Sequence, residues 1–168
     1  ADELPVVVKE LKTRFNHTRA LMNNLLDWTV LQMDKMHLQA SNVQLKKIVD
    51  ENIELLGSLQ NKHVNMINKI PETAIGYADK NTINLVIRNL ITNAIKFTND
   101  GGEIIVASED KGREIVVSVK DNGVGMPAEI QQKLFDKINP DSTRGTVNEK
   151  GTGLVLILCM ECVEKNGG

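Results

Sequence analysis

Two asparagines and a lysine stand at helical spacing near the middle of the chain. Asn89 and Asn93 are four residues apart, and Lys96 follows three residues later. On a helix this spacing places the three side chains on one face. A carboxamide oxygen is a neutral hard ligand for Mg²⁺, and a lysine ammonium offers a positive charge to phosphate. The alternative is a solvated helix face with asparagine as a polar filler, although asparagine is a mediocre helix former.

A second group of residues follows the next apolar runs. Asp121, Gly123 and Gly125 stand directly after a predicted strand. Alternate glycines let a backbone pass close to a flat ligand, and a carboxylate at a strand end can accept a hydrogen bond from an exocyclic amine such as that of adenine. A plain turn would explain the same residues.

A third group introduces the last helical pattern of the chain, at Gly151 and Gly153. Free N–H groups at a helix start, reached through glycines, suit a phosphate anion. An ordinary connection into a helix is the alternative. The Gly-Lys-Ser/Thr ending of the Walker loop is missing, and no third glycine completes a dinucleotide fingerprint.

The elements that must position these groups follow from periodicity. Apolar residues at spacings of three and four predict helices at 45–60, 80–96 and 153–166. Asp79 is placed to cap the second of these helices, and Pro127 to open a short further helix that ends near 134. Residues 136–150 are polar and show no period, so they predict a long loop of the kind that is more often functional than accidental.

Alternating and β-branched runs predict the strands. These are expected at 64–70, 75–78, 103–109 and 114–120. The last two would form a hairpin through Lys111 and Gly112. Strands in mixed order with helices between them predict an α/β sandwich, in which one mixed sheet carries helices on one face.

The first 40 residues predict a separate helical segment. From about residue 4 to 36 apolar residues recur at helical spacing, with no glycine or proline after Pro5. A helix of this length cannot bury its apolar stripe alone, so we expect it to dimerise in a helix bundle. We assign 1–40 to this stalk segment and 41–168 to the second domain, with polar residues 37–44 as the linker and Ser41 as a helix cap. Both chain ends are expected to be internal to a longer protein.

Composition limits the classes of partner. The 168 residues carry a net charge of -2, without the basic surplus of a nucleic-acid or anionic-membrane ligand. No apolar run reaches the roughly 20 residues of a membrane span, and no secretory signal is visible. We expect a cytoplasmic segment without membrane contact, with attachment of the parent protein left open. Cys159 and Cys162 lie one helical turn apart in an apolar stretch, which favours core positions over metal ligands or a redox pair.

The order and spacing of these groups resemble the ATP-binding domain of sensor histidine kinases, over about residues 45–168. Residues 89–98 look like the N box of that family, and 121–126 like its first glycine box. Residues 133–135 are similar to the F box and 151–156 to the second glycine box. The related chaperone and topoisomerase branch is disfavoured, because it needs a glutamate base where Val86, Ile87 and Arg88 precede Asn89.

The resemblance implies ATP and Mg²⁺ as ligands. Asn93, with Asn89, would hold Mg²⁺ against the phosphates, Lys96 would face the phosphates, and Asp121 would receive the adenine amino group. Asn93 and Lys96 would thus be the catalytic residues. The adenine pocket would be lined by Phe97 and Met126, and 136–150 would be the ATP lid. The other nucleotide contacts would come from Gly123, Gly125, Phe135, Gly151, Thr152, Gly153 and Leu154.

The first 40 residues resemble the second helix of the family's dimerisation stalk. The family's acceptor histidine lies on the first stalk helix and is followed by an acidic residue and then a proline. His17 is followed by Thr18 and Arg19, so we expect the acceptor to be absent and this chain not to phosphorylate itself. The implied partners are the stalk, a second kinase subunit in a homodimer, and a response regulator.

The sequence therefore predicts the Mg-ATP-binding domain of a protein-histidine kinase in two-component signal transduction. Its γ-phosphoryl group would go to a histidine outside this chain. The alternative is a degenerate, nucleotide-dependent interaction module that transfers no phosphate. That alternative rests on Val155, where the family usually has glycine. A second departure from the family is Ile138, where a second aromatic residue is common, and the two together bear on nucleotide affinity and lid closure.

Overall fold

The computed structural model describes residues 38–59, 62–134 and 155–168. The chain divides into two units, residues 1–36 and 37–168, and every described element belongs to the second unit. The expected stalk helix with His17, Phe135, the expected lid at 136–150 and residues 151–154 of the second glycine box all lie outside the described residues.

The described elements alternate between strands and helices along the chain. In order they are β1 (Ala40–Gln44), α2 (Leu45–Leu59), β2 (Asn65–Asn68), β3 (Ile75–Asp79), α3 (Lys80–Phe97), β4 (Glu103–Asp110), β5 (Ile115–Asp121), α4 (Ala128–Gln132) and α5 (Val155–Lys165). The four predicted strands are all present as β2 to β5. The helices predicted after residue 44 are present as well, although α4 is shorter than expected and the predicted start of α5 lies outside the described residues.

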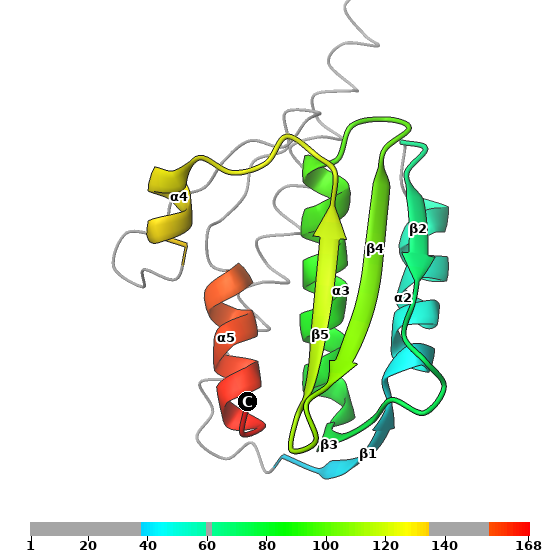
Figure 1. Ribbon diagram of the computed structural model, residues 1–168, viewed down its shortest axis with the longest axis vertical. Coiled ribbons are helices and arrows are strands. Elements are labelled where there is room, and N and C mark those ends of the chain that lie inside the picture. Colours follow the sequence, from blue (N-terminus) through cyan, green and yellow to red (C-terminus); the bar gives the residue numbers. More distant parts are fainter. Residues whose placement is uncertain (1–37, 60–61, 135–154) are drawn as a thin grey trace, which may run out of the picture. The chain divides into compact units, whose positions relative to one another are not determined.

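Three strands form the mixed sheet that the sequence predicts. The central strand β4 pairs in parallel with β2 and antiparallel with β5 (Figure 1). The predicted hairpin between β4 and β5 is confirmed. Its turn is closed by a hydrogen bond of 2.9 Å from Lys111 N to the Glu114 carbonyl oxygen, and Gly112 has a φ of 83°, where glycine has no steric penalty.

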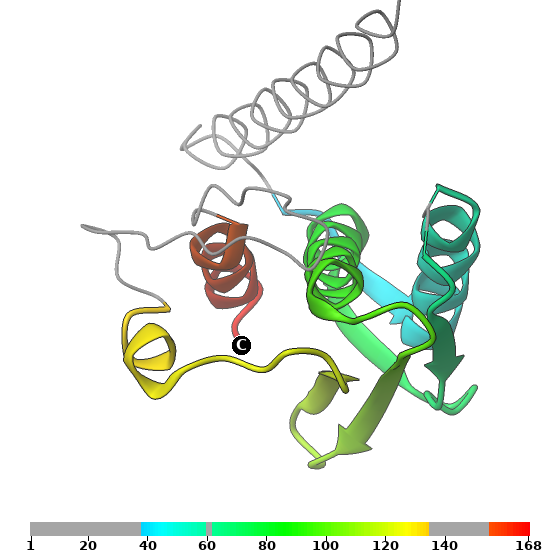
Figure 2. The same cartoon turned by 90° about the horizontal axis from the view of Figure 1, so that it is seen from above.

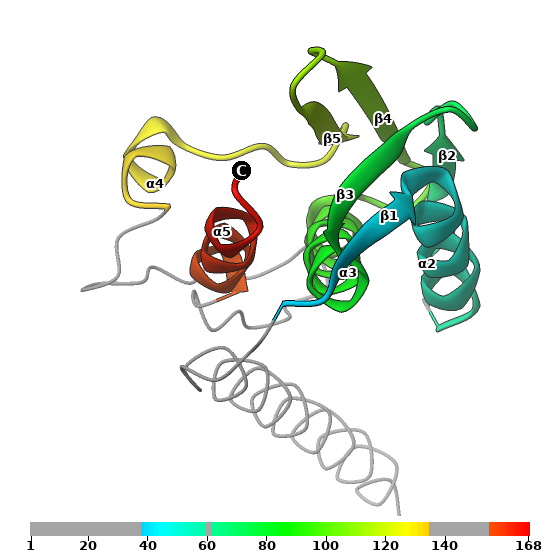
Figure 3. The ribbon, with the colours of Figure 1, turned by 90° about the horizontal axis from the view of Figure 1, so that it is seen from below.

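The predicted linker is wrong over residues 40–44. These residues form β1, which pairs antiparallel with β3, so that Ala40 lies opposite Asp79 and Gln44 opposite Ile75. Figure 3 shows the two strands side by side. Ser41 therefore lies in a strand and does not cap a helix. Only Val43 of β1 is buried, so the strand lacks the alternating apolar pattern by which strands are recognised in a sequence.

Helices α2 and α3 cover one face of the β2–β4–β5 sheet, and α5 lies beside α3 on the side away from α2 (Figure 2). The core between helices and sheet contains Ile48 and Val49 from α2, Ile87 and Ile91 from α3 and Val106 from β4. Cys159 and Cys162 are free thiols, and both are buried on α5. Their predicted place in the core is confirmed.

The N-terminus of α3 is held by side chains from two other segments. The Asp79 carboxylate caps the helix by accepting from Thr82 N at 2.9 Å, as predicted, and it also accepts from Gln39 N at 3.0 Å. Asn166, just after α5, accepts from Asp79 N at 2.8 Å and donates to the Thr82 hydroxyl at 2.8 Å. Because the end of α5 meets the start of α3, the two helices run antiparallel.

Within the described residues, no helix combines the length and the apolar character that crossing a membrane requires.

Candidate functional site

Helix α3 presents two different faces over its second half. Ile87 and Ile91 are buried against the sheet. Asn89 and Asn93 are half-buried and stand on the opposite side of the helix, and Lys96 follows one turn later on that side. The core contacts of the isoleucines fix the rotation of the helix, and this rotation decides where the two amides and the ammonium point.

The side-chain amide of Asn89 contains the one buried side-chain nitrogen or oxygen atom of the described residues that lacks a hydrogen-bond partner. Its Nδ2 atom is inaccessible to solvent and donates to nothing. A buried donor left unpaired typically costs about 1–3 kcal/mol, and native structures tolerate it chiefly where a ligand, ion or water completes the site. This position therefore fits a ligand with oxygen acceptors, and the neighbouring Asn93 adds a second amide on the same face.

The loop after β5 is docked onto the last turn of α3. Val124 N donates to the carbonyl oxygen of Phe97 at 3.0 Å. Gly123 lies so close that a Cβ on it would be 2.1 Å from the same oxygen, a separation that real Cβ atoms do not show. Glycine is required here because any side chain would clash with Phe97, and not because of the backbone conformation.

Asp121 ends β5 and starts this loop. One of its carboxylate oxygens, Oδ1, accepts from Gly123 N at 2.9 Å, and no other hydrogen bond to this carboxylate is formed within the described residues. The second oxygen is thus available to a ligand donor. The side chain is exposed, so a ligand can reach it without rearrangement of the sheet.

The same loop continues through Gly125 and Met126 to α4. Gly125 has a φ of 69°, in the left-handed region that favours glycine. Val124 and Met126 are 62% and 41% exposed, which leaves two apolar groups of this loop uncovered. The carbonyl oxygen of Met126 accepts from Gln131 Nε2 at 2.7 Å, and this contact ties the loop to α4.

The structure brings most of the described candidates to one end of α3. Phe97, Asp121 and Gly123 meet directly, and the Lys96 ammonium lies 4.9 Å from the centre of the Phe97 ring, a cation–π distance. Asn93 lies one helical turn before Phe97. No described contact joins Asn89 or Asn93 to the loop itself, and Phe135, Gly151, Thr152, Gly153 and Leu154 lie outside the described residues.

Two residues at this end of α3 carry contacts that no sequence motif indicated. The Asn122 side chain accepts from Glu103 N at 2.8 Å, which fixes the loop to the start of β4. Lys62, between α2 and β2, donates to main-chain oxygens of the last turn of α3 from 33 to 36 positions away in sequence. Such long-range contacts leave no periodic signal, so sequence patterns could not have identified either contact, although Asn122 lies within the first glycine box.

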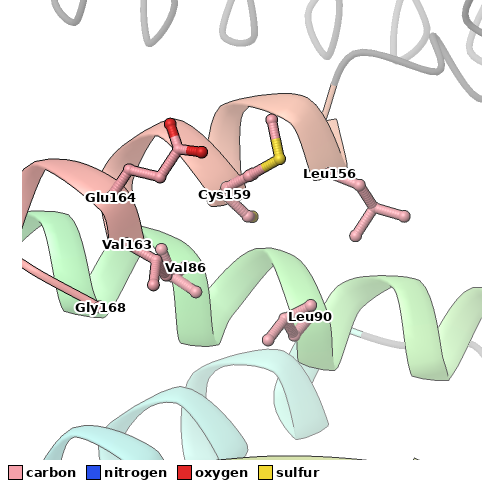
Figure 4. A pocket seen from close by; sticks show the side chains of 8 residues that line it. Val86, Leu90, Leu156, Cys159, Val163, Glu164 and Gly168 are labelled. Atoms are coloured by element: carbon pink, nitrogen blue, oxygen red, sulfur yellow. The ribbon is translucent and has the colours of Figure 1, made fainter. Parts of the chain in front are cut away.

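A separate pocket lies between α3 and α5 (Figure 4). Its volume is about 410 Å³, and it is lined by Val86, Leu90, Leu156, Cys159, Met160, Val163, Glu164 and Gly168. None of the candidate site residues that the structure describes lines it. Burial, with the neighbouring Cys162 thiol, raises the pKa of Cys159 to about 12, so this thiol is protonated at neutral pH. Within the described residues no group of three or more His, Cys, Asp or Glu side chains could hold a metal ion.

Comparison with known protein families identifies the class. Residues 78–168 match the family described as histidine kinase-, DNA gyrase B- and HSP90-like ATPases, and this match covers more than half of the chain. The chain therefore belongs to this ATPase family, and its relatives assign it to the histidine kinase branch as a catalytic ATP-binding domain.

Two curated relatives are much longer proteins. The cell-division control histidine kinase PdhS of Brucella abortus (strain S19) is 32% identical over 173 aligned residues, which cover 95% of this chain and 16% of PdhS. The signal transduction histidine-protein kinase BarA of Escherichia coli (strain K12) is 30% identical over 162 residues, covering 91% of this chain and 17% of BarA. The chain thus spans about a sixth of either relative.

A solved structure shows the same fold. The nucleotide-free catalytic domain of histidine kinase ThkA aligns with a TM-score of 0.64 and 28% identity, over 76% of this chain and 82% of that domain. ThkA has also been solved in complex with the response regulator protein TrrA; that chain aligns with a TM-score of 0.68 at 22% identity, over 100% of this chain and 45% of its own length. The second likeness concerns the fold alone.

Proposed function

We propose that this domain binds ATP together with Mg²⁺ and supplies the γ-phosphoryl group for a histidine that lies outside this chain. The observation that carries the proposal is the docking of the Asp121–Val124 loop on the end of α3 that bears Asn93 and Lys96. The docked loop carries the Asp121 carboxylate, and the same helix end bears the Lys96 ammonium, with the Asn93 and Asn89 amides about one and two turns further back along α3. These groups support recognition of adenine and phosphate.

Each candidate residue has a role that its chemistry supports. The carboxamide oxygens of Asn93 and Asn89 would hold Mg²⁺, and the unpartnered Asn89 amide fits a site completed by ligand oxygens. A bound Mg²⁺ supplies neutralising charge to the phosphates. The Lys96 ammonium would contact the phosphates, and the second oxygen of Asp121 would accept from the adenine amino group. Phe97 and Met126 would line the base, with Gly123 and Gly125 permitting its close approach.

The remaining contacts would come from the start of α5. Because α5 runs antiparallel to α3, its N-terminus points toward the half of α3 that bears the two amides. Main-chain N–H groups of Gly151, Thr152, Gly153 and Leu154 would donate to the phosphates there, with Phe135 contributing from the F box.

The proposed phosphoryl transfer forms no covalent bond to this chain. An unprotonated imidazole nitrogen of the acceptor attacks the γ-phosphorus, the bond to the β-γ bridging oxygen breaks, and ADP leaves with that electron pair. The proton on the other ring nitrogen is released to water. Catalysis then consists of positioning and charge neutralisation, which a site without its own nucleophile can provide.

The partners we propose belong to the full-length protein. They are the dimerisation stalk, a second kinase subunit and a response regulator in the cytoplasm. The ThkA–TrrA complex supports the last of these, since a kinase of the same fold binds such a regulator. The alternative, a degenerate module without phosphate transfer, rests on Val155, which is the first residue of α5. The transfer experiment described below separates it from a kinase domain.

Isothermal titration of ATP with and without Mg²⁺ tests the proposal, with Asp121→Asn as the variant. We expect Mg²⁺-dependent binding by the wild-type chain and a loss of about tenfold or more in Asp121→Asn, since a hydrogen bond to a charged group is worth about 1.5–3 kcal/mol. Asp110→Asn is the matched control, because Asp110 Oδ1 accepts from Gly112 N at 2.7 Å in the same local arrangement on the hairpin.

Two results would count against nucleotide recognition. One is the absence of ATP or ADP binding by the wild-type chain with Mg²⁺ present. The other is an equal loss in both aspartate variants, which would reduce the role of Asp121 to holding its turn. Transfer itself is tested by adding the first stalk helix of the parent kinase and looking for acid-labile phosphate on its histidine.

A further inference from the structure

The ammonium group of Lys62 sits on the C-terminal end of α3. Its Nζ donates to the main-chain oxygens of Ile95 at 2.9 Å, Lys96 at 3.1 Å and Thr98 at 3.1 Å. An ammonium has three donors, and here three carbonyl oxygens accept from it. The side chain is partly buried, so these contacts are shielded from competition by water.

Lys62 makes no hydrogen bond to the Phe97 carbonyl oxygen, and this oxygen accepts instead from the loop that follows β5. The last carbonyl groups of a helix lack partners within the helix and carry partial negative charge. At the end of α3, Lys62 takes the oxygens on both sides of Phe97, and the Phe97 oxygen accepts from Val124 N. The two groups therefore share one helix end without competing for it.

Lys62 reaches this position from a firmly held segment. His63 N donates to Asp100 Oδ1 at 2.6 Å, and the His63 carbonyl oxygen accepts from Gly101 N at 2.7 Å. Asn65 N donates to the Gly102 oxygen at 2.9 Å, where β2 begins. The starts of β2 and β4 and the ends of α3 and β5 gather at the same edge of the fold (Figure 1).

We propose that Lys62 is a positioning residue for the nucleotide site. It fixes the last turn of α3 so that the Phe97 carbonyl meets Val124, and it thereby sets the place of the Asp121 loop relative to Asn93 and Lys96. Its charge also offsets the negative end of the α3 dipole, which would otherwise repel a polyphosphate along this helix. This inference rests on the proposed function.

The test compares Lys62→Met and Lys62→Arg with Lys69→Met in the full chain. Lys69 is exposed at the other end of β2, so its variant removes the same charge without touching α3. The first measurement is the exchange of the Val124 amide hydrogen in the ligand-free chain, followed by NMR. The second is the dissociation constant for Mg-ATP, at a temperature where every variant is folded.

We expect Lys62→Met to raise Val124 exchange at least about tenfold and to weaken Mg-ATP binding about tenfold, by loss of the hydrogen bonds that hold the turn. The amides of β4 should keep their protection. Lys62→Arg should restore both quantities, since a guanidinium can donate to the same oxygens, and Lys69→Met should change neither.

Three results would overturn the role of Lys62. They are unchanged Val124 exchange in Lys62→Met, an equal rise across the amides of β4, and faster exchange with unchanged affinity for Mg-ATP. A wild-type chain that binds no nucleotide is a different result, because it removes the proposed function itself. A wild-type chain that binds, beside a Lys62→Met chain that binds equally well, removes only the inference.

Discussion

Gly123 and the carbonyl oxygen of Phe97 lie closer together than a side chain on the glycine would allow. A Cβ on Gly123 would be 2.1 Å from this oxygen and 2.7 Å from the carbonyl carbon. The next residue, Val124, donates its N–H to the same oxygen at 3.0 Å. The loop that follows β5 is therefore packed on the last turn of α3, and the Gly123 N–H of this loop holds one oxygen of the Asp121 carboxylate at 2.9 Å.

Gly123→Ala should displace the loop. Overpacking of this kind typically costs about 1–3 kcal/mol, and we expect a drop of that size in the free energy of unfolding measured in urea. Titration should show Mg-ATP binding weakened by about tenfold or more, since the Gly123 N–H that holds the Asp121 carboxylate moves with the loop. The control is Gly57→Ala in helix α2, where the nearest atom to the new Cβ is Met66 Cε of β2 at 3.5 Å. Alanine should stabilise that helix by about 0.5–1 kcal/mol. A Gly123→Ala chain as stable as the wild type would show that the loop can move away from Phe97 without loss of stability.

Asn89→Leu should raise the stability of the ligand-free chain and weaken its binding of Mg-ATP. The leucine removes the buried, unpartnered amide, so we expect the ligand-free chain to gain about 1 kcal/mol or more in the free energy of unfolding. The same change should abolish the Mg²⁺-dependent part of ATP binding. Asn81→Leu, at an exposed position of α3, reports how much of the gain comes from helix propensity. A less stable Asn89→Leu chain that still binds Mg-ATP would show that the amide is a structural group.

Low pH should weaken the Asp79 cap at the N-terminus of α3 and so lower the free energy of unfolding. Burial acts to raise the pKa of the Asp79 carboxyl, but hydrogen bonds from the main chains of Thr82, Gln39 and Asn81 outweigh it, so the pKa lies below the ordinary 3.8. A depressed carboxyl pKa stabilises the fold fully above the unfolded value, and this contribution disappears as pH falls through the native value. We expect Asp79→Asn to lose on the order of 1 kcal/mol at pH 7, because its NH₂ group cannot accept from Gln39 N.

The measurement for Asp79 is the free energy of unfolding of both chains between about pH 7 and 2. The difference between them should shrink below about pH 5, where the unfolded carboxyl of the wild type begins to bind protons. Asp110→Asn on the exposed hairpin controls for the loss of one negative charge. A difference that stays constant with pH would contradict the depressed pKa.

Cys159 should resist thiol reagents in the folded chain. Burial, aided by Cys162, raises the pKa of its thiol to about 12, so almost no thiolate is present at pH 8. We expect site-resolved mass spectrometry to find labelling of Cys159 only at the rate of unfolding, and immediate labelling in urea. Between about pH 9 and 12 stability should fall, because the unfolded thiol releases its proton and the native one does not. Rapid labelling of the native chain at pH 8 would show that the reagent reaches Cys159 through the pocket beside α3 and that the thiol ionises there.

Much of the fold was predictable because its signals are local. The Asp79 cap, the α3 periodicity, the hairpin at Lys111 and Gly112 and the apolar setting of the two cysteines each lie within a few neighbouring residues. β1 was missed for the opposite reason. Four of its five residues are exposed, and its pairing partner β3 lies on the far side of α2 and β2 in sequence, so neither periodicity nor propensity could indicate it.

The amino-acid sequence by itself determined which groups exist and how they repeat: the amides of Asn89 and Asn93 on one helix face, the Asp121 carboxylate after a strand, and glycines where a backbone must come close. Helical spacing and capping are local properties, so the order of residues is enough to specify them. Only the tertiary structure decided that the Phe97 carbonyl oxygen accepts from Val124 N, that Lys62 donates to the same helix end, and that the Nδ2 atom of Asn89 is buried without a partner. These relationships join residues far apart in the chain, and they arise because packing of α3 against the sheet fixes the rotation and end point of that helix.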